Sequence, residues 1–281
     1  DDVSTTATTT TARPGASATP STATVAPAAP LNVAVSTLPR KLPAAHYQTG
    51  AAVVDGKIVV IGGLDANKSS TNVVWRFDPT TGTTTDLGRI PKSQHDAAVA
   101  AVGTSVFAFG GTEGASQFDR VLVLKPGAAN AVDTGAKLPT ARSNAVGVTV
   151  DDGTRALIIG GFDGKNPTND VLATTDGTTF AAAATLTEPV RYPAVAAVGA
   201  TVWVFGGIWN DQSTASIQKI DLATGTASVV GTLPAPLSHA SAFVIDGSIF
   251  IAGGRNANGR TAEISRFDPV ALTTTPVAKL P

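Results

Sequence analysis

Short apolar runs separated by polar turns divide most of the chain into similar units. Each run is about five residues long and ends in a glycine pair, as in KIVVIGG, SVFAFGG, RALIIGG, TVWVFGG and SIFIAGG. The first glycines of the pairs are Gly62, Gly110, Gly160, Gly206 and Gly253, so the spacings are 48, 50, 46 and 47 residues. A repeat of this length indicates one supersecondary unit per repeat.

Each unit contains four segments with the pattern of β-strands. An alternating segment such as TGAAVVD leads through a turn at Asp55-Gly56 into the run that ends in Gly-Gly. A two-residue Asp-Gly turn between apolar runs is a strong hairpin signal. A third strand such as NVVWRFD and a fourth such as TTTDLGRI follow. We therefore predict an all-β fold in which residues 31–281 form a five-bladed β-propeller with about twenty strands.

The repeats resemble those of the kelch family. The resemblance covers residues 31–281 and is carried by the five glycine pairs, the apolar runs before them, the Asp-Gly hairpins and the Leu-Pro links at Leu42-Pro43, Leu138-Pro139 and Leu233-Pro234. The Tyr/Trp markers that usually follow the glycine pair are weak, since Trp75 is matched elsewhere by Phe77, Phe267 and Leu124. The resemblance implies a β-propeller whose ring is closed by one terminus completing the blade that the other begins.

One strand-like segment is surplus to five blades. NVAVSTLP at 32–39 matches TASVVGTLP at 226–234 and TTTPVAKLP at 273–281, so six segments have the pattern of the fourth strand. Either the extra segment only pads an outer edge of the propeller, or it pairs with another molecule. Exposed edges with few charges favour such pairing.

The first 30 residues have a composition that differs from the repeats. Nine Thr, eight Ala, four Pro and three Ser account for 24 of them, which is too little apolar surface for a core. We interpret 1–30 as an extended low-complexity tail that is O-glycosylated or donates a strand, because Thr is β-prone. Candidate glycosylation sites are Thr5, Thr6, Thr8, Thr9, Thr10, Thr11, Thr19, Thr22, Thr24 and, in the sequon Asn-Lys-Ser, Asn67.

Composition and charge exclude several classes of function. With 20 Lys+Arg against 21 Asp+Glu the net charge is −1, which argues against binding nucleic acid through bulk charge. Cysteine is absent, so a disulfide, a thiolate metal site and a cysteine nucleophile are excluded. No apolar run approaches ~18 residues, so we predict no transmembrane segment. The chain opens at Asp1 without a signal-peptide core, and we interpret it as a mature chain that acts outside the cell.

Few residues carry the chemistry of a site, and most lie in links between successive units. The only histidines, His46, His95 and His239, are in such links and form a candidate metal site, such as one for Zn²⁺. The alternative is that each is an ordinary polar loop residue. We expect no other cofactor.

The same links supply candidate binding residues at the rim of the channel. Arginine holds carboxylates, and an exposed tryptophan stacks on sugars or partners. The candidates are Arg142, Arg191, Tyr47, Tyr192 and Trp209. For the arginines the alternative is a hydrogen bond between blades, and for Trp209 it is local packing.

Two functional hypotheses remain. The first is a secreted, non-enzymatic propeller that binds extracellular proteins, glycans or copies of itself, and assembles head-to-tail through its N-terminal region and surplus strand. The second is a carbohydrate-binding or carbohydrate-active propeller that uses the channel rim. Copper-radical oxidases among kelch proteins need a Cys–Tyr crosslink, which this chain cannot form. No nucleophile–base–orienter pattern is present, so the first hypothesis is favoured.

Overall fold

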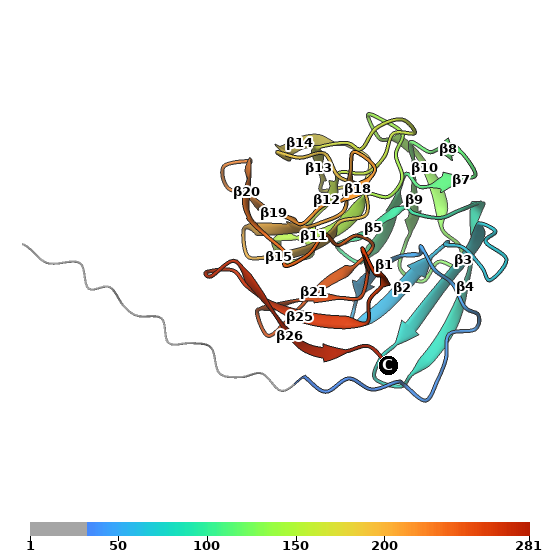
Figure 1. Cartoon of the computed structure of the whole chain (residues 1–281). Helices are drawn as coiled ribbons and strands as arrows, with labels where there is room; N and C mark the ends of the chain where they lie inside the picture. The colour runs from blue at the N-terminus through green and yellow to red at the C-terminus, as the bar shows by residue number, and fades with distance from the viewer. Residues whose placement is uncertain (1–32) are drawn as a thin grey trace, which may run out of the picture. The chain divides into compact units, whose positions relative to one another are not determined.

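A computed structural model describes residues 33–281, and the predicted tail at 1–30 lies outside these residues. The described chain folds into five four-stranded antiparallel sheets, which are the blades of a β-propeller (Figure 1). Each sheet places its strands in chain order from the centre of the ring outward. The predicted all-β, five-bladed fold is confirmed.

The strands are grouped here by their position in the blade. The first, innermost strands are β1 (Gly50–Val54), β5 (Ala98–Val102), β11 (Val146–Val150), β15 (Ala194–Val198) and β21 (Ser241–Ile245). The second strands are β2 (Lys57–Ile61), β6 (Ser105–Phe109), β12 (Arg155–Ile159), β16 (Thr201–Phe205) and β22 (Ser248–Ala252). The third strands are β3 (Thr71–Asp78), β9 (Arg120–Leu124), β13 (Asp170–Thr174), β19 (Ser216–Asp221) and β25 (Glu263–Asp268). The fourth, outermost strands are β4 (Thr83–Gln94), β10 (Val132–Lys137), β14 (Ala181–Thr185), β20 (Thr226–Thr232) and β26 (Thr273–Lys279).

Three blades carry a short hairpin between their second and third strands. These hairpins are β7 (Thr112–Glu113) with β8 (Ser116–Gln117), β17 (Ile208–Trp209) with β18 (Gln212–Ser213), and β23 (Arg255–Asn256) with β24 (Gly259–Arg260). Within residues 33–281 the only helical turn is the 3₁₀ segment η1 (Asp151–Gly153). The hairpins therefore project from one end of each of these blades, at the end of the second strand.

The glycine pairs are required by the backbone where the second strand ends. Gly160 has φ = 59° and Gly161 has φ = 117°, both in the left-handed region that side chains disfavour. A Cβ atom on Gly160 would lie 2.4 Å from the carbonyl oxygen of Val190. Each pair thus turns the chain tightly against the link that leads to the next blade, which explains the periodic signal in the sequence.

The core consists of four hydrophobic clusters, each between two successive blades. The first joins blades 1 and 2, with Ile61 and Val99 among its members. The others join blades 2 and 3, 3 and 4, and 4 and 5, where Phe205 and Phe267 meet with ring centroids 4.9 Å apart. Alternation along each strand makes this possible, because both faces of an inner blade are covered.

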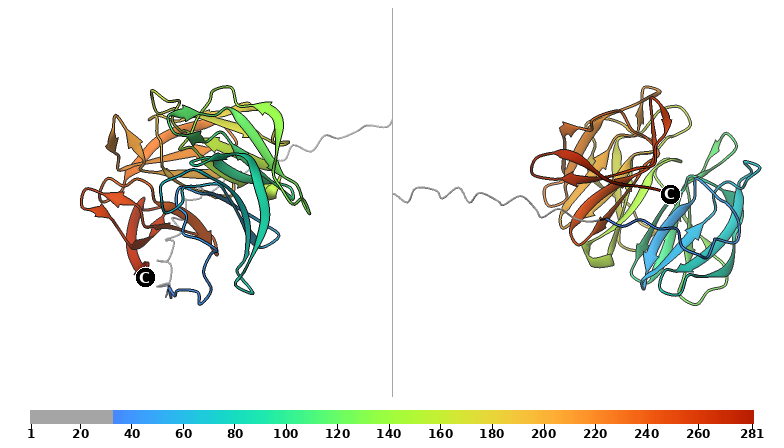
Figure 2. Two further views of the ribbon diagram at one scale, coloured as in Figure 1. Left: turned by 90° about the vertical axis from the view of Figure 1, so that its right-hand side faces the viewer. Right: turned by 60° about the horizontal axis from the view of Figure 1, so that its bottom comes forward.

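The surplus segment does not form a strand within the described chain. Residues 33–38 have no strand pairing, and Val35 and Leu38 are exposed. All five outer positions are filled by β4, β10, β14, β20 and β26, so the segment has no vacant place in its own ring. In both views of Figure 2 the segment after Asn32 passes from the side of blade 5 to the side of blade 1.

Candidate functional site

The ring is incomplete between its last and first blades, and we call this place the seam. It lies between β21 and β1 and is faced by Val53, Phe243 and Ile245. Val53 is 62% exposed, whereas Ala101 at the same position of blade 2 is 3% exposed. Phe243 is 38% exposed, against 1% for its counterpart Ala100. Apolar side chains that are buried between the other blades are therefore open at the seam.

A thread of backbone hydrogen bonds also stops at the seam. One residue in each link donates its N–H to the carbonyl of its counterpart in the preceding link, over 2.9–3.1 Å. The bonds run from Asp96 to Gln48, Asn144 to Asp96, Tyr192 to Asn144, and His239 to Tyr192. The fifth bond, from Gln48 to His239, is missing, and within residues 33–281 no hydrophobic cluster joins blades 5 and 1. Four of the five blade interfaces are formed.

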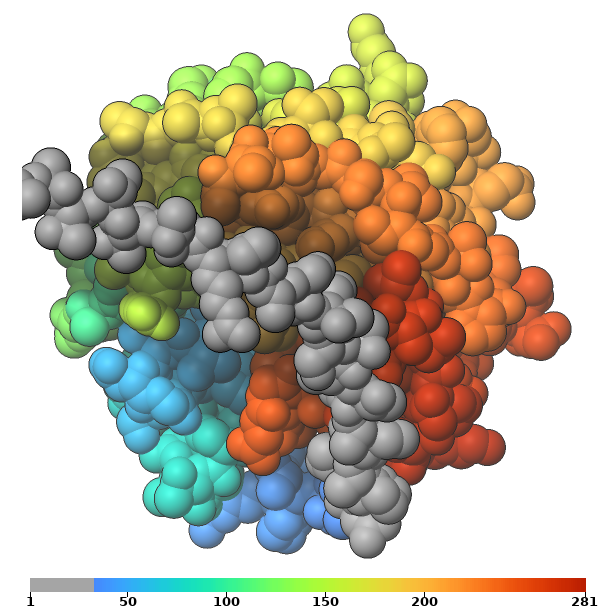
Figure 3. All heavy atoms as spheres, turned by 90° about the vertical axis from the view of Figure 1, so that its left-hand side faces the viewer, coloured from blue at the N-terminus to red at the C-terminus, as the bar shows by residue number. Residues whose placement is uncertain are grey.

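The seam is continuous with the central channel. The channel encloses about 530 Å³ and is lined by all five innermost strands, mostly through Gly, Ala, Val and Thr side chains. Val53 of blade 1 and Ser241 and Ala242 of blade 5 are part of this lining. Figure 3 shows the molecule from the side where blue and cyan atoms of blade 1 lie near red atoms of blade 5. An occupant of the seam would thus also contact the wall of the channel.

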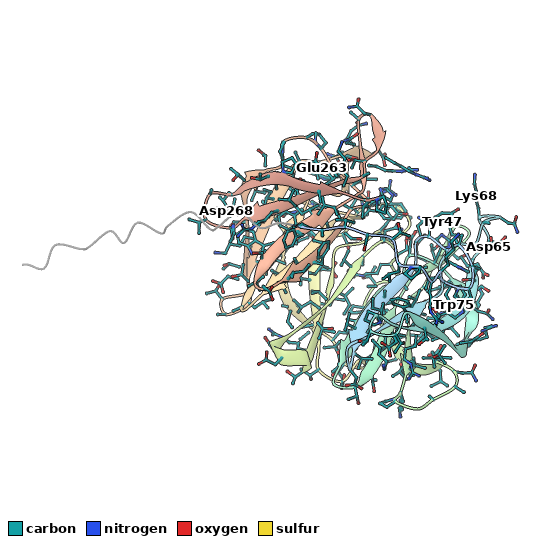
Figure 4. All side chains as sticks on the ribbon, turned by 90° about the horizontal axis from the view of Figure 1, so that it is seen from below. Tyr47, Asp65, Lys68, Trp75, Glu263 and Asp268 are labelled. Atoms are coloured by element: carbon teal, nitrogen blue, oxygen red, sulfur yellow. The ribbon has the colours of Figure 1, made fainter. Side chains whose placement is uncertain are left out.

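The blade 1 side of the seam is partly covered by His46, from the segment that leads into β1. His46 contacts Trp75 edge-on, with ring centroids 4.7 Å apart, and Trp75 is 4% exposed. Figure 4 shows Tyr47 and Trp75 on blade 1, with Glu263 and Asp268 on blade 5. The exposed apolar surface is therefore concentrated near the innermost strands rather than at the outer rim.

Side chains of the five thread residues form a polar cluster, which we call the link cluster: Gln48, Asp96, Asn144, Tyr192 and His239. Gln48 Nε2 donates to Asp96 Oδ2 over 2.9 Å and to the Tyr192 hydroxyl over 3.1 Å. The Tyr192 hydroxyl donates to Asp96 Oδ2 over 2.9 Å. His239 stacks on Tyr192 with ring centroids 3.9 Å apart. The cluster ties blade 1 directly to blade 4, although the intervening seam is open.

Burial controls the protonation of the link cluster. Burial raises the pKa of Asp96 to about 7, against the opposing effect of hydrogen bonds from Tyr192 and Asn144. Burial also raises the pKa of Tyr192, and the neighbouring Asp96 adds to this. The pKa of His239 is lowered by burial and then by the charges of Arg255 and Arg191. The cluster can therefore hold or release a proton at Asp96 near neutral pH.

The three histidines do not meet as a metal site. They occupy three successive positions of their aligned links. His46 packs on Trp75, His95 shares a 2.8 Å hydrogen bond with the Ser70 hydroxyl, and His239 stacks on Tyr192. Within the described residues no group of three His, Asp or Glu side chains is placed to hold a metal ion. The structure does not bring the three rings together, because they lie at different link positions of different blades and each contacts a different partner.

Arg142 is a structural residue and not a rim ligand. It is 1% exposed and forms a bidentate pair with Asp170, over 2.7 and 2.6 Å, from the link into blade 3. It also donates to the carbonyl of Gly160 over 3.1 Å. The prediction that Arg142 lines the rim is therefore corrected: its guanidinium is buried and fully engaged.

We expect Arg142→Lys to lower the free energy of unfolding by about 2 kcal/mol, because lysine cannot form the bidentate pair in a buried place. Arg191→Lys is the matched control, since Arg191 pairs with Asp211, whose side chain is 91% exposed. An exposed pair contributes roughly 0–1 kcal/mol. Chemical denaturation of both variants measures the difference. Equal losses would contradict the structural role of Arg142.

Of the other rim candidates, Tyr47 and Trp209 are exposed, whereas Arg191 and Tyr192 are partly buried. Tyr47 is 43% exposed and Trp209 is 36% exposed. When the links are aligned, His46 and Arg142 share one position, and Arg191 occupies the next position. Arg191 stacks on Phe162, with its guanidinium carbon 4.5 Å from the ring centroid. Among the rim candidates only Tyr192 belongs to the link cluster, where it stacks on His239. Asn67 is exposed in a loop, while the tail threonines lie outside the described residues.

Three members of the link cluster were missed by sequence reasoning. Gln48, Asp96 and Asn144 stand two residues before the first strand of their blades, as Tyr192 and His239 do. In four repeats this position is 14 residues before the first glycine of the pair, and in the third it is 16 because the turn there is longer. Aligning the repeats on their glycines would have grouped the five residues.

Comparison with known proteins supports the assignment of the repeats. A family model described as the kelch motif matches residues 45–83 and 236–280. These are parts of blades 1 and 5, the two blades that flank the seam. A search of curated proteins finds no matching relative. The structure is thus a five-bladed β-propeller with kelch motifs in its first and last blades, and the kelch propeller fold typically serves as a protein-binding module.

No helix in the described part of the chain has the length and apolar character that a membrane span needs.

Proposed function

We propose that this propeller is a non-enzymatic binding module whose seam receives a polypeptide segment from a second copy of the chain. The donor is the N-terminal region, residues 1–38. The observation that carries the proposal is the seam itself, where Val53 and Phe243 remain exposed at the one blade interface that is not formed. Large exposed apolar side chains at one place mark interaction sites.

The composition of the donor suits the seam and the channel behind it. Arg13 is the only charged residue between positions 3 and 38, and most of the others are Thr, Ala, Pro or Ser. The channel lining also consists of small uncharged residues. An extended segment binds through main-chain hydrogen bonds and needs only small pockets for its side chains. A Thr-rich donor is therefore compatible with a narrow, weakly polar site.

The position of residues 33–38 supports donation to another molecule. Residues 33–38 have no strand pairing, although their sequence matches β20 and β26. The 32 residues before them reach roughly 100 Å when extended, at ~3.3 Å per residue. Head-to-tail donation is a heterologous contact, which produces an open filament unless the geometry closes a ring. We place this assembly outside the cell, a location that fractionation of the source cells tests.

Self-association should depend on both the donor and the seam. We expect the full chain to form oligomers or filaments, and the variant 39–281 to remain monomeric while keeping its cooperative unfolding. Val53→Asp should also abolish association, because it places a charge in the apolar seam. Light scattering after size-exclusion chromatography, with electron microscopy of the largest species, measures this.

Val132→Asp is the matched control, since Val132 is 52% exposed on β10, away from the seam. It should associate as the unmodified chain does. Adding the peptide 1–38 should block association of the full chain by competing for the seam. Monomers of both the full chain and 39–281 at high concentration would overturn the proposal.

A further inference from the structure

The hairpin β23–β24 of blade 5 carries two arginines directly opposite each other, Arg255 and Arg260. The paired positions that follow the glycine pair are uncharged in the other four blades: Leu64 with Ser70, Thr112 with Gln117, Phe162 with Pro167, and Ile208 with Ser213. Like charges directly opposite on neighbouring strands are destabilising. The arginine pair is therefore a feature of blade 5 that the fold does not require.

Both arginines are exposed and lack an internal counter-charge. No carboxylate of residues 33–281 forms a salt bridge with either guanidinium. Neither side chain donates a hydrogen bond to another described residue. Exposed guanidinium groups without a partner among the described residues are available to bind an external anion.

A third arginine, Arg191, lies in the link before blade 4, where it pairs with the exposed Asp211 over 3.1 Å and stacks on Phe162. Hydrogen bonds connect the β17–β18 hairpin of blade 4 to the β23–β24 hairpin of blade 5. The Ser213 hydroxyl donates to the Ser238 hydroxyl over 3.0 Å, and Ser238 and Arg255 exchange backbone hydrogen bonds. Arg191 pairs in turn with Ile208 of the neighbouring hairpin. Its Nε is buried without a hydrogen-bond partner among the described residues. Burial is the largest cause of the lowered pKa of His239, and the charges of Arg255 and Arg191 lower it further, so both arginines are close to that ring.

The β17–β18 hairpin of blade 4 carries an exposed aromatic ring. Trp209 follows Ile208 in β17 and is 36% exposed. An indole ring offers an apolar face with a polar edge, on which a sugar ring stacks. An acidic polypeptide would pair with the cations through its carboxylates. A sugar chain that carries anionic groups would pair with the cations and also stack on the indole.

We infer that Arg191, Trp209, Arg255 and Arg260, here named the arginine surface, bind an anionic polysaccharide. Its carboxylate or sulfate groups would pair with the arginines, and its sugar rings would stack on Trp209. This site goes beyond the proposed function, because it shares no residue with the seam and does not depend on the N-terminal donor.

Binding of heparin, polygalacturonate and dextran to the full chain tests the inference, with polyglutamate as the competing polyanion. Heparin presents sulfates, polygalacturonate presents carboxylates, and dextran is neutral. We expect at least one of the two anionic polysaccharides to bind and dextran not to bind. The double variant Arg255→Gln/Arg260→Gln should weaken binding about tenfold or more, which corresponds to the loss of ~1.4 kcal/mol. Trp209→Ala should also weaken binding of the polysaccharide.

The matched control is Lys125→Gln/Lys165→Gln, which removes the same charge from exposed positions in blades 2 and 3. Binding to this control, to 39–281 and to Val53→Asp should equal that of the unmodified chain, which separates this site from the seam. Equal losses in the control and in the arginine double variant would overturn the inference. Binding of polyglutamate as tight as that of the polysaccharides, with no effect of Trp209→Ala, would assign the surface to an acidic polypeptide instead.

Discussion

Replacing Gly160 by valine should lower the free energy of unfolding by about 3 kcal/mol or more. Gly160 has φ = 59°, a conformation that a β-branched residue adopts only with strain. Its added Cβ would also lie 2.4 Å from the carbonyl oxygen of Val190, which accepts a hydrogen bond from Gly161. Urea unfolding followed by circular dichroism measures the change.

Gly56→Val separates the two causes of this effect. Gly56 has φ = 68°, but no atom lies within 4 Å of the position that its Cβ would take. Only the backbone strain applies there, and we expect a loss of about 1–2 kcal/mol. If both variants lose the same amount, the close approach at Gly160 contributes nothing and the interpretation of the glycine pair is wrong.

The stability of the propeller should fall as pH rises from about 4 to about 7, by an amount that Asp96 controls. The folded state raises the pKa of Asp96 to about 7 from an ordinary value of 3.8, so the folded protein binds this proton more tightly than the unfolded chain. The stabilisation is complete below pH 3.8 and is lost as pH rises through 7. About three pH units at ~1.4 kcal/mol each set an upper limit of about 4 kcal/mol.

Asp96→Asn should remove this dependence, because an amide resembles the protonated carboxyl and does not titrate. The measured quantity is the difference in unfolding free energy between the variant and the unmodified chain across pH 4.5–7.5. His95 and His239, whose pKa values are lowered, act in the opposite direction and cancel in this difference. Asp55→Asn, in an exposed turn, serves as the control. A difference that stays constant with pH would show that Asp96 does not titrate in this range.

The blades could be predicted from the sequence because their signals are local. The Gly160-Gly161 pair and its four counterparts recur at nearly constant spacing, and the Asp55-Gly56 turn fixes which strands pair. The alternation of side chains between the two faces of a strand then predicts which of them are buried between sheets. None of this requires knowledge of distant parts of the chain.

The site could be predicted only in part, because its residues come from different blades. Tyr192 and His239 drew attention as rare residue types, whereas Gln48 and Asp96 are ordinary polar residues in ordinary links. The hydrogen bond from Gln48 to Tyr192 joins positions 144 residues apart. Arg142 was misassigned for the same reason, since nothing near it in the sequence indicates that Asp170 lies within 2.7 Å.

The sequence alone determined that this protein has five four-stranded units, that glycine pairs end the second strands, and that thiol chemistry is excluded. These conclusions rest on backbone conformation and composition, which act within a few residues. The tertiary structure decided that the interface between blades 5 and 1 is open, that Asp96 is buried with Gln48 and Tyr192, and that Arg255 and Arg260 are exposed without a counter-charge among the described residues. Those properties depend on how far one blade turns relative to the next. That rotation is set by packing over the whole ring.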